Sequence, residues 1–98
     1  MNLDLDNMLT IGTIVKLKLS PRNVMIIGYS ADSDDELYDY IGCAYPLGVF
    51  DLNHNLVFNV DDIDKVISEG YSSELSNKYK EKHMLFLKEV KSMIETKD

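Results

Sequence analysis

Residues 15–29 read VKLKLSPRNVMIIGY, and this stretch predicts a β-hairpin. Its first five residues alternate between apolar side chains and lysines, which is typical of a strand with one face buried and the other in water. Pro21 and Asn23 then mark a turn, because proline presets one backbone torsion and asparagine tolerates left-handed backbone. The apolar run over residues 24–29 is a second strand, and the two should pair across the turn.

Three more segments resemble strands. An acidic loop over residues 30–37 leads into a third strand over residues 38–45, which ends where Pro46 removes a backbone donor. Residues 56–58 form a short fourth strand, and residues 59–64 resemble a capped single turn of helix. Residues 65–71 fit either a fifth strand or more helix. The spacing of Ile63, Val66 and Ile67 is helical, whereas the β-branched content favours the strand.

Residues 72–96 predict a long amphipathic helix. Ser72 or Ser73 can cap its start, and Glu74 suits the positive end of the helix dipole. Side chains of one stripe recur at intervals near three and four, namely Leu75, Tyr79, His83, Phe86, Val90, Met93 and Ile94, with Leu87 flanking them. At 1.5 Å per residue the helix is roughly 36 Å long, which exceeds the width of a small body. We therefore expect its end to overhang.

These elements predict one α+β domain. It should contain a small, strongly bent antiparallel sheet, or SH3-like partial barrel, of about five strands followed by a long C-terminal helix. We divide the chain into a loosely ordered N-terminus (1–8), a β-rich body (9–71) and the C-terminal amphipathic helix (72–98). A length of 98 residues suits one domain.

The charge of the chain is strongly negative and unevenly spread. Seventeen acidic residues against ten basic ones give a net charge of −7. Residues 1–71 hold four basic and twelve acidic residues, whereas residues 72–98 hold six and five. Such a body repels nucleic acid and anionic membrane surfaces and attracts basic proteins. The N-terminus lacks a signal peptide and no apolar run of about 18 residues occurs, so we expect a cytoplasmic protein.

Catalytic and metal-binding patterns are missing from the sequence. His54 and His83 have no partner at metal-ligand spacing, and Cys43 is the only cysteine. The acidic run at residues 32–36 lacks the central glycine and the distant glutamate of a calcium-binding EF-hand loop, so it reads as a solvated loop. The sequence therefore predicts no metal, no cofactor and no enzyme activity.

Two features instead point to a protein partner. The chain has six tyrosines and no tryptophan, and Tyr38 and Tyr40 share one face of the third strand. Tyrosine suits interfaces because it joins a large contact area to a polar tip, although it also packs half-buried in small barrels. The overhanging helix should also seek a partner. The candidate partner-binding residues are Tyr38, Tyr40, Tyr79, Phe86, Val90, Met93 and Ile94.

Short motifs in the body carry a resemblance to a known family. They are Asp-Tyr-Ile-Gly at residues 39–42, Tyr-Pro-Leu-Gly at 45–48 and Glu-Gly-Tyr at 69–71, with flanking matches at 11–17, 25–28, 58–63 and 66–68. In order and spacing the chain resembles a domain-of-unknown-function family of Gram-positive bacteria, encoded beside type VII secretion clusters and LXG-type toxins. The resemblance covers about two-thirds of the chain and implies no catalytic residues.

The resemblance implies a cytoplasmic accessory protein for toxin export, a chaperone or targeting factor that binds an LXG-type effector. An immunity protein, whose acidic face neutralises a basic toxin domain, is the alternative. A small enzyme is a third. Oligomeric state stays open, because a homodimer through the C-terminal helix would use the same stripe.

Overall fold

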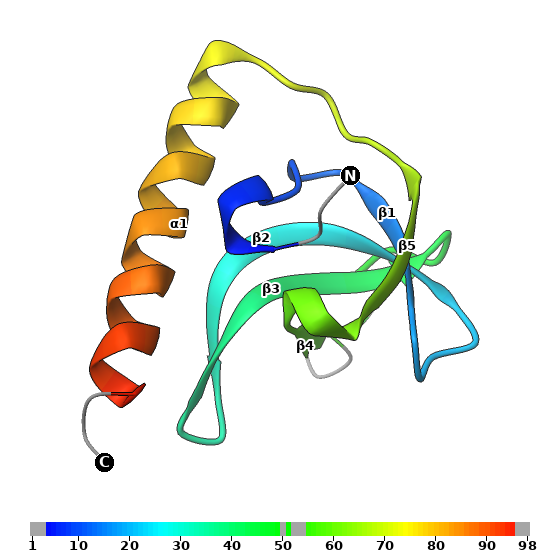
Figure 1. Ribbon diagram of the computed structural model, residues 1–98. Coiled ribbons are helices and arrows are strands. Elements are labelled where there is room, and N and C mark those ends of the chain that lie inside the picture. Colours follow the sequence, from blue (N-terminus) through cyan, green and yellow to red (C-terminus); the bar gives the residue numbers. More distant parts are fainter. Residues whose placement is uncertain (1–3, 50, 52–54, 96–98) are drawn as a thin grey trace.

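The chain folds into one sheet and one long helix, as a computed structural model shows (Figure 1). The structure describes residues 4–49, 51 and 55–95, with only the backbone for Ile94 and Glu95. Five antiparallel strands form a sheet that is not closed into a barrel, and a single C-terminal helix follows them. The predicted α+β class is therefore confirmed.

The sheet has the strand order β4-β3-β2-β1-β5. Its strands are β1 (Ile14–Leu17), β2 (Asn23–Ser33), β3 (Glu36–Tyr45), β4 (Leu56–Phe58) and β5 (Ile63–Ser68). The predicted hairpin of residues 15–29 is confirmed by the pairing of Val15 with Val24. Of residues 65–71, which we left between strand and helix, residues 65–68 are strand and belong to β5, which pairs antiparallel with β1, whereas residues 69–71 lie in the linker that follows.

The β2–β3 hairpin is longer than we expected. We had assigned residues 30–37 to a loop, but Ser33 pairs directly with Glu36. The two residues between them, Asp34 and Asp35, both have positive φ angles, 51° and 65°. Two such residues make the tight hairpin turn whose twist matches that of the strands, and aspartate tolerates this backbone. Most of the acidic run is therefore a strand end and a tight turn.

A short 3-10 helix, η3 (Val60–Asp62), connects β4 to β5. The capped helical turn expected near residues 59–64 is confirmed, with the backbone N–H of Asn59 donating to Asp62 at 2.8 Å. Val60 and Ile63 are buried beside it. The turn thus closes one side of the core.

The N-terminus is more ordered than we expected. Asp4 caps a second 3-10 helix, η1 (Leu5–Asn7), and Met8, Leu9 and Thr10 are buried. Residues 4–8 therefore belong to the folded domain, because their apolar side chains complete the core. Residues 1–3 of the segment we expected to be loose lie outside the described residues.

The long helix α1 (Glu74–Glu95) runs alongside β2 and η1 (Figure 1). Leu87, with no exposed surface, is its deepest side chain and joins the core that the sheet builds. The linker before it passes close to the N-terminal segment at Gly70. A Cβ atom there would lie 2.4 Å from the carbonyl oxygen of Ile11, so only glycine permits this approach.

Candidate functional site

Four large apolar side chains lie exposed along one side of α1. We call them the α1 stripe, and their exposed fractions are 81% for Leu75, 48% for Tyr79, 47% for Phe86 and 58% for Met93. They span about 27 Å at 1.5 Å per residue. Large apolar side chains gathered in the open on one side of a helix are a feature of protein-binding surfaces.

The stripe is rotated away from the face that holds the helix to the body. We expected Leu87 to flank the stripe, but it is the centre of the buried face, and Phe86 lies about 100° around the helix from it. Lys80 and Lys91 also lie on the buried face, half-buried, where we had placed neither. The buried face of the helix is therefore centred about one residue beyond Phe86, and the stripe lies at its edge.

Aromatic packing holds the first part of the α1 stripe in place. The ring of Tyr79 lies 4.5 Å from the ring of His83 and 5.8 Å from that of Tyr29 on β2, between centroids. His83 in turn shares a hydrogen bond of 2.7 Å between its Nδ1 and the Oγ of Ser30. Burial, and secondly the charge of Lys82, lower the pKa of His83, so the neutral ring is favoured. Tyr79 is thus positioned before any partner binds.

The distal candidates on the helix divide into three cases. Val90 is half-buried and Met93 is exposed. The side chain of Ile94 lies outside the described residues. We expected this end of α1 to overhang the body, but the neighbouring Lys91 reaches back to Asp39 on β3. The predicted overhang is therefore wrong for the part of the helix that ends at Lys91, because this contact holds it against the sheet.

Tyr40, which we expected at the partner-binding surface, is a core residue. Only 1% of it is exposed, and its ring stacks on Phe58 with centroids 5.5 Å apart. Its burial raises its pKa to about 12. Tyr40 is therefore no partner contact, because its side chain is buried in the core.

Tyr38 keeps its place at the surface. It is half-buried, and its hydroxyl donates to Oε2 of Glu36 at 2.8 Å. This hydrogen bond to a carboxylate raises the pKa of Tyr38. Among the described residues, no hydrogen bond and no ring contact joins Tyr38 to the α1 stripe. Tyr38 and the stripe are therefore separate candidate surfaces.

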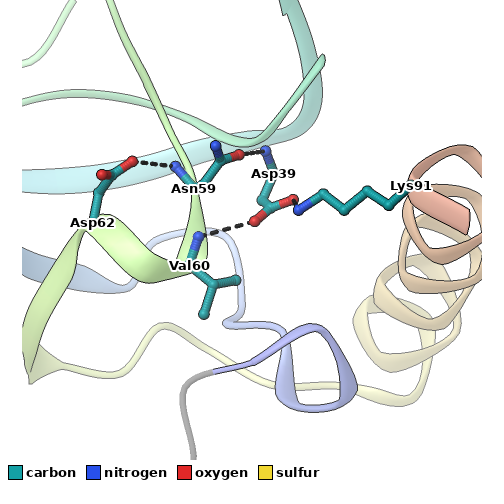
Figure 2. A network of polar contacts seen from close by, with 5 residues as sticks. All are labelled: Asp39, Asn59, Val60, Asp62 and Lys91. Carbon is teal, nitrogen blue, oxygen red and sulfur yellow. Dashed lines mark hydrogen bonds and ion pairs between the residues drawn. The ribbon is translucent and has the colours of Figure 1, made fainter. Parts of the chain in front are cut away.

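A polar network joins α1 to the sheet (Figure 2), and its one visible sign in the sequence is a charged residue within a strand. The carboxylate of Asp39, 1% exposed, accepts from Nζ of Lys91 at 2.7 Å and from the backbone N–H of Val60 at 2.9 Å. The backbone N–H of Asp39 donates to Oδ1 of Asn59 at 3.0 Å. Asp39 thus links β3, η3 and α1.

A groove of about 480 Å³ lies on the other side of α1. It runs between the N-terminal segment, the linker that contains Gly70, and the first half of the helix, where Lys80 and Met84 line it. Lys80 reaches across to Oγ1 of Thr10 at 3.3 Å, and Lys88 pairs with Asp6. These contacts tie the helix to the N-terminal segment.

Two other kinds of site are absent from the part of the chain that the structure describes. No group of three or more His, Cys, Asp or Glu side chains there is placed to share a metal ion. No described helix has both the length and the apolar character needed to cross a membrane. His54, one of two histidines considered as a ligand, lies outside the described residues.

Comparisons with known proteins give one match. Residues 8–79 match the family described as Domain of unknown function (DUF4176). No curated protein and no solved structure matches the chain. The matched range runs from the buried Met8 to Tyr79, and so includes the whole sheet and the start of α1. Since it covers well over half of the sequence, the chain belongs to the family of Domain of unknown function (DUF4176).

Proposed function

We propose that this protein is a non-catalytic accessory factor that binds a helix of an LXG-type effector on the α1 stripe. It would act in the cytoplasm as an export chaperone or targeting factor for type VII secretion. The observation that carries the proposal is the exposure of four large apolar side chains on one side of a single helix. Burying them against a partner is favourable because it removes apolar surface from water.

A helical partner fits the shape of this surface. Leu75 and Tyr79 are four residues apart, and Phe86 and Met93 follow at intervals of seven. Such spacing is how a helix meets another helix or a groove, with side chains aligned over several turns. A straight stripe of about 27 Å matches roughly five turns of a partner helix.

The energy of such a contact should be concentrated in the aromatic side chains. Phe86 is half-exposed and has no aromatic neighbour among the described residues, so a partner can cover its ring. Tyr79 is already fixed by Tyr29 and His83, so little side-chain freedom is lost when a partner covers it. Buried aromatics commonly dominate the binding energy of protein interfaces.

The negative charge of the body should speed the association with a basic partner more than it strengthens the final complex. Residues 1–71 carry four basic and twelve acidic residues, a net charge of −8, whereas residues 72–98 carry a net charge of +1. A basic partner is drawn toward the body, and the apolar contact then forms on the helix. The family resemblance supplies the partner class, since members of that family are encoded beside LXG-type toxins.

Co-expression tests the proposal. The protein should co-purify with the helical region of an LXG-type effector. Phe86→Asp should abolish co-purification, because it places a charge in the apolar contact. Leu85→Asp is the matched control: Leu85 is also exposed, at 58% against 47% for Phe86, but lies about 100° around the helix from Phe86. Loss of the complex in both variants, or in neither, would rule out the α1 stripe as the docking surface.

An immunity protein is the alternative role, and the acidic body favours it if the toxin domain is basic. The two roles differ in what deletion of this protein does. Without an export chaperone the effector stays in the cell, and its activity in vitro is the same with or without the purified protein. Without an immunity protein the cell is poisoned, and the purified protein inhibits the toxin directly.

A further inference from the structure

Three of the four residues of the α1 stripe, Tyr79, Phe86 and Met93, are spaced symmetrically about Phe86. Tyr79 lies seven residues before it and Met93 seven residues after it, and seven residues are nearly two full turns. One charge of each sign lies on the same flank of the stripe. Lys82 is four residues before Phe86 and Glu89 is three residues after it, and the two differ by about 20° around the helix axis.

This arrangement is complementary to a second, identical helix that runs in the opposite direction. If two α1 helices cross antiparallel at Phe86, the two phenylalanines meet and each Tyr79 lies level with a Met93 of the other copy. Each Lys82 then comes within about one residue's rise, 1.5 Å, of the level of the other copy's Glu89. Two-fold symmetry makes the Tyr79–Met93 and Lys82–Glu89 contacts occur twice, whereas the two Phe86 side chains meet once, on the axis.

We propose that a second copy of this chain docks antiparallel on the α1 stripe and forms a homodimer. Lys82 and Glu89 are both exposed, and within the described part of the chain neither forms a hydrogen bond or an ion pair. Both are therefore available to the second copy. The meeting segments carry six basic and five acidic residues, so they add little like-charge repulsion despite the acidic body.

The dimer goes beyond the proposed function, because it concerns this protein alone. It also adds a form of regulation. The same stripe cannot hold a second copy and an effector helix together, so effector binding should convert the dimer into a complex with one copy of this chain. Covering the stripe in the free protein also reduces its exposed apolar surface.

Sedimentation equilibrium over a range from low to high micromolar concentration tests the dimer. The wild-type protein should pass from the mass of one 11.2 kDa chain to twice that mass. Lys82→Glu alone and Glu89→Lys alone should each raise the dimer dissociation constant about tenfold, because two pairs become repulsive. The double variant K82E/E89K should restore the wild-type value, since the pairs re-form with their signs exchanged.

The controls separate this proposal from a folding defect and from the proposed function. Leu19→Asp, at a side chain 98% exposed between β1 and β2, should dimerise like the wild type, and far-ultraviolet circular dichroism should show unchanged helix content in every variant. A wild-type protein that stays monomeric throughout would overturn the dimer, and so would a double variant as weak as either single one. If that monomeric protein still binds an effector helix through Phe86, the proposed function stands and only the dimer fails.

Discussion

Lys91 in the last turns of α1 donates a hydrogen bond of 2.7 Å to the carboxylate of Asp39, which β3 holds almost completely buried. The pair fixes the distal half of the helix, where Leu87 is the only fully buried side chain among the described helix residues. A buried carboxylate needs such a partner, because an unpaired buried charge is costly.

Replacing Lys91 with methionine should therefore destabilise the fold. Methionine keeps the apolar stem but leaves Oδ1 of Asp39 without its partner. Because Lys91 is itself partly exposed, we expect a loss of about 1–2 kcal/mol in the free energy of unfolding, below the value for a fully buried pair. Urea denaturation measures it. Lys78→Met, which breaks only an exposed pair with Glu74, is the control and should change little. Equal effects of the two substitutions would contradict the role of Asp39.

Two tyrosines hold the backbone of Leu9 from both sides. The hydroxyl of Tyr40 accepts from the N–H of Leu9 at 2.9 Å, and the hydroxyl of Tyr29 donates to its carbonyl oxygen at 2.6 Å. Tyr40→Phe should cost about 1–3 kcal/mol, because it leaves a buried N–H without an acceptor. Thermal or urea unfolding measures the loss. Tyr38→Phe, which removes a hydroxyl bonded only to Glu36, should melt like the wild type. A neutral Tyr40→Phe would mean that the N-terminal segment is not held in this way.

Alkaline pH should weaken the fold through the same residues. Burial raises the pKa of Tyr40 from 10.0 to about 12, and it also raises the pKa of Tyr29. Since the unfolded chain loses these protons first, the stabilising contribution is complete below pH 10 and is lost as the pH rises toward 12. The free energy of unfolding should therefore fall over this range, and less steeply in Tyr40→Phe. Identical pH dependence in the two proteins would contradict the burial of the Tyr40 hydroxyl.

The fold was largely predictable from local sequence patterns. Alternation in residues 15–19 and the turn at Pro21 predicted the first hairpin, because burial of one sheet face requires a period of two. The β2–β3 turn was missed because a run of acidic residues reads as loop, whereas Asp34 and Asp35 supply the positive φ angles of a tight turn.

The candidate site was less predictable, because the periodicity of a helix shows an apolar stripe but not which edge of that stripe packs against the body. Lys80 and Lys91 look like solvent-facing residues, yet both lie half-buried toward the body and bond to Thr10 and Asp39. Their long stems cover apolar surface while the amines find polar partners. Tyr40 shows the same limit on a strand. The alternation of side chains placed Tyr40 on the same face as Tyr38, but it did not indicate whether that face is turned to the core, where Tyr40 lies.

The most direct test of the central claim is the affinity of an LXG effector's helical region for this protein, measured by isothermal titration calorimetry. The account predicts that Phe86→Asp weakens binding at least about tenfold while Leu85→Asp binds like the wild type, with unchanged melting temperatures in both. Equal affinity of the Phe86→Asp and Leu85→Asp variants would contradict the α1 stripe as the partner-binding surface.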